Sequence, residues 1–255
     1  MCPLFSSREP EPEPSAEPVT SGFPVITGAE IAATTYGKRV AGDFYESLRV
    51  SPERVLFGLL DVAGRREKNQ GILSAAGQMF RSVGAELFSR PDFNEAEAMT
   101  EICHRLNIGL MEAAGGVISC PGFIGCYHEI FGTLCYTNAG HTPGLLRDKS
   151  GITELASTGL PLGLFSHATC DAPTVALEKG SALLLVSRGV VEGRCKSDRE
   201  EDLEYGLERV KERLLGQSSQ NAEAICASVL NAVGEFTCEP LVPDDMTALA
   251  FVRNE

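Results

Sequence analysis

Strand-like and helix-like segments come in separate blocks along this chain of 255 residues. Helical periodicity predicts helices over 69–89, 94–113, 202–215 and 220–234. Apolar, β-branched runs predict strands over 39–48, 54–62, 122–130, 132–138, 142–147, 173–178, 181–187 and 246–253. Two helices follow the first strands, a block of strands comes next, two more helices follow, and one strand closes the chain. This segregation predicts an α+β fold rather than an alternating parallel sheet.

The chain divides into a short tail and one large domain. Residues 1–22 include a Pro-Glu alternation from Glu9 to Pro14, which can neither pack nor pair as a ladder, so we expect a disordered acidic tail. Residues 23–255 have a globular pattern, and the 43% hydrophobic content of the chain is enough to bury a core.

Charge and cysteine usage narrow the function classes. A net charge of −13 argues against a nucleic-acid or anionic-membrane surface and favours protein or small-molecule partners. The nine cysteines show no CxxC spacing and only four histidines accompany them, which argues against zinc and for reduced thiols. No apolar run approaches the roughly 20 residues that span a bilayer. We therefore expect a cytoplasmic protein.

Three aspartates lie far apart in the chain, each at the border of a strand-like run. They are Asp43, Asp61 and Asp244, and a fourth such border carries Arg188. Carboxylates gathered from distant strand ends supply the oxygen ligands that hard cations prefer. A guanidinium at one corner would oppose cation binding.

Six short motifs in a fixed order surround these residues. They are Gly42-Asp43-Phe44-Tyr45, the run from Val55 to Gly64, Asn138-Ala139-Gly140-His141-Thr142-Pro143, Gly159-Leu160-Pro161-Leu162-Gly163, the run from Leu183 to Glu192, and Asp244-Asp245-Met246-Thr247. In order and spacing the series resembles the PPM-type (type 2C-like) metal-dependent Ser/Thr phosphatases. The likeness is to the bacterial branch typified by stage II sporulation protein E and the sigma-B regulatory phosphatases, over roughly residues 28–253.

The resemblance implies a fold and a metal site. The fold would be a four-layer α-β-β-α sandwich, two antiparallel sheets flanked by helix pairs. The site would hold two manganese or magnesium ions that activate a water for attack on a phosphoserine or phosphothreonine. Carried over, Asp43 holds one ion, Asp61 bridges both, the Val62 carbonyl adds an oxygen, and Asp244 holds the other ion. No catalytic side chain beyond the metal site is implied.

Arg188 departs from the family pattern. The family's fourth carboxylate lies in a turn that here reads Ser187-Arg188-Gly189. A divalent ion about 4 Å from a guanidinium is repelled by several kcal/mol even at an effective dielectric constant of about 20. We therefore expect one bound ion or none.

Two functions follow from that departure and stay open. In the first, the chain is an active phosphatase with an altered or single-metal site. Either one ion stays bound at Asp43 and Asp61, or a neighbouring carboxylate replaces the lost ligand, the candidates being Glu192, Asp198 and Asp202. In the second, which the charge argument favours, Arg188 fills the vacated metal position, pairs with Asp61 and Asp244, and the domain is a pseudophosphatase.

Smaller expectations concern the residues around these motifs. Arg65 and Arg66 replace the usual His-Gly after Gly64 and could contact phosphate, although a solvated charge cluster is the simpler interpretation. We expect His141 to organise a turn through hydrogen bonds, and Asp245 to end a loop. The resemblance also implies a phosphoprotein or regulatory protein partner in a partner-switching pathway, and it allows a homodimer.

Overall fold

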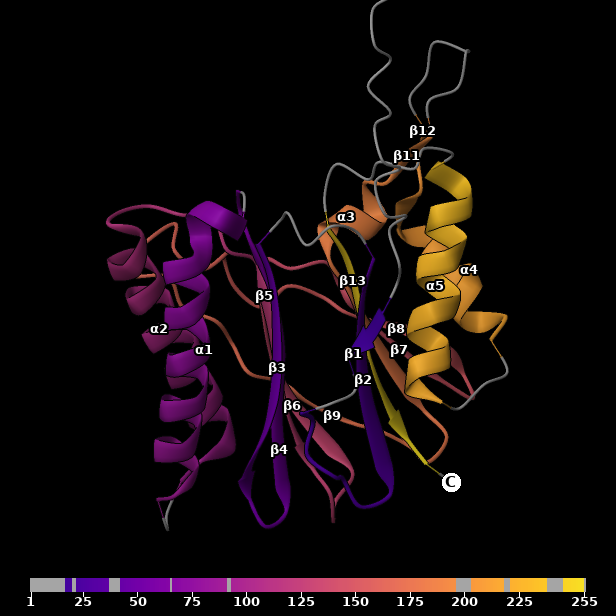
Figure 1. Cartoon of the computed structure of the whole chain (residues 1–255). Coiled ribbons are helices and arrows are strands. Elements are labelled where there is room, and N and C mark those ends of the chain that lie inside the picture. The colour runs from indigo at the N-terminus through magenta and orange to yellow at the C-terminus, as the bar shows by residue number, and fades with distance from the viewer. Residues whose placement is uncertain are drawn as a thin grey trace, which may run out of the picture.

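A computed structural model describes most of the chain, namely residues 17–19, 22–36, 42–64, 66–90, 93–195, 203–217, 221–237 and 245–254. Two sheets stack face to face, and a pair of helices covers the outer face of each sheet (Figure 1). This is the four-layer α-β-β-α sandwich that the family resemblance implied.

The first sheet has five strands, and every neighbouring pair is antiparallel. In spatial order they are β3 (Gly42–Ser51), β4 (Arg54–Val62), β5 (Gly122–His128), β6 (Thr133–Ala139) and β9 (Thr174–Ala176). Helices α1 (Arg66–Phe88) and α2 (Glu95–Ala114) cover its outer face.

The second sheet has six strands and is also antiparallel throughout. In spatial order they are β1 (Glu17–Val19), β2 (Ala29–Tyr36), β13 (Met246–Arg253), β10 (Ala182–Val186), β7 (Gly144–Asp148) and β8 (Gly151–Leu155). Helices α4 (Gly206–Leu215) and α5 (Ala222–Thr237) cover it. The short helix α3 (Arg188–Val191) follows β10, and the ribbon of β11 (Arg194–Cys195) and β12 (Leu203–Glu204) follows α3.

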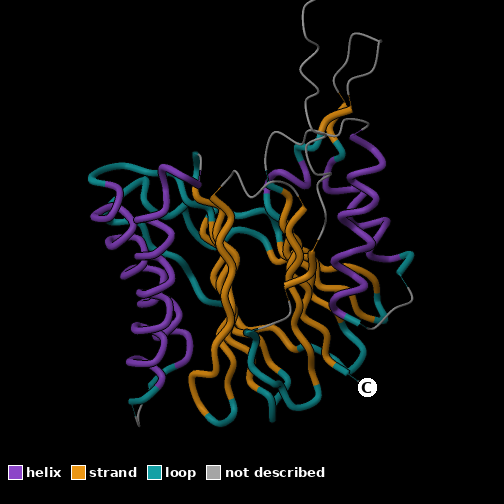
Figure 2. Tube along the Cα trace, in the orientation of Figure 1, coloured by secondary structure: helices purple, strands orange, loops and turns teal. Residues whose placement is uncertain are grey.

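Alternate residues of the strands supply separate hydrophobic cores. In β4, Phe57 and Leu59 enter the core between the sheets, whereas Leu56 and Leu60 enter the core under α1 and α2. Because side chains of a strand point to opposite faces in turn, a strand covered on both faces must be apolar at nearly every position. This is why β4 reads as an uninterrupted apolar run. The tube view separates the two stacked sheets from their helical covers (Figure 2).

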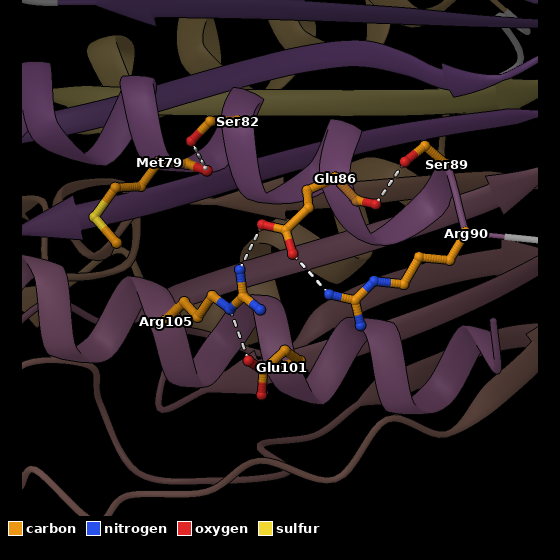
Figure 3. Close-up of polar contacts among 7 residues, drawn as sticks. All are labelled: Met79, Ser82, Glu86, Ser89, Arg90, Glu101 and Arg105. Atoms are coloured by element: carbon orange, nitrogen blue, oxygen red, sulfur yellow. Dashed lines mark hydrogen bonds and ion pairs between the residues drawn. The ribbon is translucent and has the colours of Figure 1, made fainter.

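Local sequence signals set the ends of α2 and its contact with α1. The Asn94 side-chain oxygen accepts hydrogen bonds from the first-turn backbone N–H groups, and Gly115 ends the helix at a φ of 67°. On the exposed side Arg105 of α2 reaches Glu86 of α1 at 2.7 Å, and Arg90 reaches the same carboxylate at 2.6 Å (Figure 3). The helix pair is thus joined by an apolar face inside and by ion pairs outside.

Most sequence-predicted elements are confirmed, and β4 and β13 have the predicted bounds. The prediction missed β2, whose sequence is rich in alanine and threonine instead of large β-branched residues. Small side chains there let α5 lie close, with Cys226 Sγ 3.6 Å from the Ala32 carbonyl oxygen. It also missed β8 and the short elements β1, α3, β11 and β12.

The expected disordered tail, residues 1–22, is described in part. Residues 17–19 form β1, which pairs with β2, and the disorder of the tail otherwise stays a prediction. Residues 1–16 and 20–21 lie outside the described residues. Among the described residues, no helix is both long enough and apolar enough to cross a bilayer.

Candidate metal centre

Asp43 and Asp61 lie directly opposite each other on the neighbouring strands β3 and β4. Directly opposed residues of an antiparallel pair share one face of the sheet. Asp61 continues the alternation of Phe57 and Leu59, both of which enter the core between the sheets. Both carboxylates therefore face the second sheet, as a pair of metal ligands from these strands requires.

The backbone around this pair is held by close contacts. The Asp61 N–H donates to the Pro121 carbonyl at 2.8 Å, and the Ala63 N–H donates to the Ser119 carbonyl at 2.9 Å. A side chain at Gly42 would place its Cβ 2.2 Å from the Val62 carbonyl oxygen. The glycine thus allows the close approach that holds the Val62 carbonyl beside Asp43.

The loop after β4 is tied to the start of α1. Gly64 has a φ of 104°, and the buried Asn69 side chain donates to the Ala63 carbonyl at 2.9 Å. Arg65 lies outside the described residues, as does the side chain of Arg66 at the start of α1. Their expected contact with phosphate therefore stays a prediction.

The second sheet supplies polar groups that sequence reasoning did not assign. Ser187 Oγ accepts the Thr247 N–H at 3.0 Å, and the Thr247 hydroxyl lies 3.2 Å from that of Thr35. Asp245, expected only to end a loop, is buried, and its charge acts on Asp43. The sequence does hold a signal for Thr247. It is a polar residue in the apolar strand β13, on the same side as Leu249 and Phe251, which enter the core between the sheets.

Burial dominates the electrostatics of Asp43. It raises the pKa of the Asp43 carboxyl group to about 7, and the neighbouring Asp61 and Asp245 act in the same direction. Hydrogen bonds from the Thr247 and Ser187 hydroxyls oppose this rise. The Oδ2 atom of Asp43 is buried with no hydrogen-bond partner in the described part of the chain. A proton or a cation is needed to neutralise this carboxyl group.

Arg188 does not neutralise it. The Arg188 side chain is 58% exposed at the start of α3, and its Nε lies 3.7 Å from a carboxylate oxygen of Glu192. The ion pair expected between Arg188 and Asp61 is not formed between these two described residues. The expected partner Asp244 lies outside the described residues, as do the alternative ligands Asp198 and Asp202.

His141 organises the turn after β6, as expected. Its N–H donates to the Asn138 side-chain oxygen at 2.8 Å, and its ring Nδ1 lies 3.0 Å from the Thr142 carbonyl oxygen. Burial lowers the pKa of the imidazole, and the negative charge of Asp61 acts in the opposite direction. A neutral His141 therefore borders the carboxylate pair.

The donor set suits a hard divalent cation. Two convergent carboxylates and a backbone carbonyl are oxygen ligands of the kind that magnesium and manganese prefer. The orphaned, buried Asp43 oxygen is the observation that fits an ion. The described residues hold no group of three or more His, Cys, Asp or Glu side chains arranged around one ion position. Asp244, the expected third carboxylate, is outside that set.

The sequence model of one protein family, stage II sporulation protein E (SpoIIE), matches residues 51–254. The chain belongs to the SpoIIE family. No curated protein sequence matches the chain.

Solved structures of other proteins share the fold of this SpoIIE-family domain. The RsbU and RsbW domains of a Mycobacterium tuberculosis protein match with a TM-score of 0.69 and 22% identity, over 91% of this chain and 63% of that one. The PP2C phosphatase domain of Bacillus subtilis SpoIIE, with a fragment of its regulatory domain, gives 0.71 and 15%, over 88% and 63%. The catalytic domain of the phosphatase PstP, in complex with two manganese ions, gives 0.55 and 14%, over 89% and 99%.

These likenesses establish a PP2C-like fold for the chain. It spans just under two thirds of the length of the first two proteins, 63% in each case.

Proposed function

We propose that this SpoIIE-family domain is a PP2C-like Ser/Thr phosphatase module that recognises a phosphoprotein or regulatory protein of a bacterial partner-switching pathway. It holds one divalent ion, manganese or magnesium, at Asp43 and Asp61. Its hydrolysis is weak or absent because Arg188 stands where the family places a further carboxylate. The observation that carries the proposal is the buried, unneutralised Asp43–Asp61 pair on neighbouring strands.

The relatives support this choice of chemistry and partner. PstP was solved with two manganese ions, and the mycobacterial relative contains an RsbU and an RsbW domain. Because this SpoIIE-family domain shares the fold of these relatives, we expect it to bind a phosphoprotein of the same kind of pathway.

Each residue of the site has a distinct part in this proposal. Asp43 and Asp61 bind the ion, and the Val62 carbonyl adds an oxygen. Ser187 and Thr247 orient Asp43 from the second sheet through hydrogen bonds. A bound ion would supply Lewis acidity toward a phosphoryl oxygen and would lower the pKa of a coordinated water.

Arg188 limits the second ion in two ways, by replacing a carboxylate ligand and by adding a positive charge. The guanidinium lies at the exposed start of α3, next in sequence to Ser187. Its exposure means that water and salt weaken its repulsion of an ion. The lost carboxylate ligand is therefore the larger defect, and the added positive charge is the smaller one.

A second candidate is an active phosphatase with an altered or single-metal site. It is favoured by the pairing of Arg188 with Glu192, because a paired guanidinium repels a metal ion less than a lone one. In this candidate the charge of Arg188 is largely offset by Glu192.

A paired hydrolysis assay separates the two candidates. Turnover of an aryl phosphate and of a phosphoserine peptide is measured with manganese for the native chain, Arg188→Asp and Arg194→Asp. Arg194 is a matched control because its side chain is also 58% exposed and pairs with a nearby glutamate. We expect turnover to rise at least tenfold in Arg188→Asp alone. Equal manganese-dependent turnover in all three proteins would favour the active phosphatase.

A further inference from the structure

Two buried thiols from distant parts of the chain touch each other. Cys103 lies on α2 and Cys170 lies in the segment between β8 and β9, and their Sγ atoms are 2.8 Å apart. The two residues are 2% and 5% exposed, and both belong to the core between the first sheet and its helices. Both are free thiols in the structure.

The contact makes the two sulfur atoms chemically different. The Cys103 thiol donates its hydrogen to the Cys170 sulfur. This hydrogen bond lowers the pKa of the Cys170 thiol and raises that of Cys103. Because the thiolate is the nucleophile in cysteine oxidation, Cys170 is the sulfur that reacts first. It is also the more exposed of the two.

We propose that Cys103 and Cys170 form a reversible disulfide when the protein meets a peroxide. The Cys170 thiolate attacks one peroxide oxygen, the O–O bond breaks, and the products are a Cys170 sulfenic acid and a hydroxide that takes up a proton to become water. The Cys103 sulfur then attacks the Cys170 sulfur, the S–O bond breaks, and a second water leaves. Two thiols and one hydrogen peroxide give one disulfide and two waters.

The bond would fasten a segment that α2 already holds at a second point. One helical turn after Cys103, the Asn107 side chain donates to the Phe165 carbonyl at 2.9 Å and accepts the Gly163 N–H at 2.7 Å. A disulfide would thus restrain the segment at both ends of its contact with α2, at Gly163 and at Cys170.

The same segment borders the candidate metal centre. Leu162 and Cys120 exchange two backbone hydrogen bonds, of 2.9 and 3.0 Å. The next residue, Pro121, accepts the N–H of Asp61 at 2.8 Å. Oxidation of the thiol pair would therefore stiffen the backbone that supports Asp61.

Peptide mapping tests the pair directly. The folded native protein is treated with hydrogen peroxide, its remaining thiols are alkylated, and the digest is analysed by mass spectrometry without reduction. We expect a linked peptide pair containing Cys103 and Cys170, lighter by two hydrogen atoms and separated again by dithiothreitol. Unfolding of the oxidised protein should shift to a higher temperature.

Variants and an internal control make the outcome decisive. Cys126 and Cys135 face each other across β5 and β6 in the same core. Burial raises the pKa of both thiols, so this pair should stay reduced. In Cys103→Ser, dimedone should trap a sulfenic acid at Cys170, while Cys126→Ser should still form the linked pair. Linkage only after unfolding in urea, or equal linkage of Cys126 to Cys135, would overturn the proposal. If the variants do not fold, the map of the native protein alone decides.

Discussion

At the residue scale, the buried Asp43 carboxyl group has the strongest influence on how the site responds to pH. Its pKa of about 7 in the folded protein exceeds the ordinary value of 3.8, because burial and two other carboxylates disfavour its charge. A group with a raised pKa binds its proton more tightly in the folded state than in the unfolded state. Its contribution to stability is complete below the ordinary value and is lost as the pH rises through about 7.

Asp43→Asn should remove that pH dependence. In the presence of a chelator, we expect the native protein to lose stability across this window, by up to about 1.4 kcal/mol for each unit of pKa shift. The variant should be the more stable protein at neutral pH and should bind manganese poorly. Thermal unfolding at a series of pH values measures this, with the exposed Asp171→Asn as control. Parallel pH profiles for native protein and Asp43→Asn would contradict the assignment.

Gly42 tests the close approach of the two strand ends. A Cβ at position 42 would meet the Val62 carbonyl oxygen at 2.2 Å, so Gly42→Ala must push β3 and β4 apart beside both aspartates. We expect lower stability and weaker manganese binding. Gly71→Ala is the matched control, because Gly71 lies in α1 with open space around its Cβ position. That substitution should stabilise the helix by roughly 0.5–1 kcal/mol. Denaturant unfolding with and without manganese compares the two.

Sequence reasoning found part of the site at this scale. Asp61 stood out because a carboxylate at the end of an apolar strand requires a partner, and Asp43 stood out through its place in the ordered motifs. Their role as metal ligands, which the family resemblance implies, stays a prediction. The outward direction of Arg188 was not identifiable, since the side chain pairs with Glu192 at the C-terminal end of α3. The burial of Asp245 was missed because a pair of aspartates before a strand also suits an exposed turn.

At the scale of elements, the apolar face between the helices and the first sheet should matter far more than the ion pairs on the surface. Glu86 of α1 accepts from Arg105 of α2, which joins the two helices on the solvent side, and from Arg90, which lies just after α1 (Figure 3). Exposed ion pairs contribute little because water and salt screen them. We expect Glu86→Gln to change the unfolding temperature only slightly, and not at all at high salt.

Met99→Ala is the contrasting substitution on α2. Met99 is fully buried in the core under the helices, so its truncation leaves a cavity and should cost about 2–5 kcal/mol. Urea unfolding of both variants at low and high salt makes the comparison. A larger loss for Glu86→Gln than for Met99→Ala would show that the ion pairs dominate the packing of α1 and α2.

The sequence predicted strands correctly where both faces of the strand are buried, because such strands are apolar at nearly every position. It failed where a neighbouring helix determines which side chains fit on the strand. Strand β4 lies between a sheet and a helix pair and reads as a strand from its own residues. Strand β2 carries small residues because α5 lies close against it. The two residues in that contact, Ala32 and Cys226, are 194 positions apart in the chain. Local periodicity therefore could not reveal β2.

At the scale of the whole molecule, the site depends on the stacking of the two sheets. Asp43 and Asp61 come from the first sheet, whereas Thr247 comes from the second and Ser187 directly follows its strand β10. The α+β class followed from the separate blocks of strands and helices, and the four-layer architecture followed from the family resemblance that the six ordered motifs carry. The contacts between the sheets had to come from the structure.

Phe251 tests this dependence. The centroid of its ring lies 5.3 Å from that of Phe57, on which it stacks, and 4.6 Å from that of Tyr127. These contacts join the second sheet to the first. We expect Phe251→Ala to cost about 3–5 kcal/mol and also to weaken manganese binding. Phe80→Ala, in the core under the helices, should cost a similar amount with less effect on the metal. Calorimetric titration at a temperature where both variants are folded separates the two effects; equal losses of manganese affinity would contradict the dependence on stacking.

The stoichiometry of manganese binding tests the central claim most directly. Calorimetric titration of the native chain should give one ion, which Asp61→Asn abolishes, because the proposal assigns that ion to Asp43 and Asp61. Arg188→Asp should restore a second ion by returning a carboxylate to its family position. Two tightly bound ions in the native chain, or tight binding that survives Asp61→Asn, would contradict the claim.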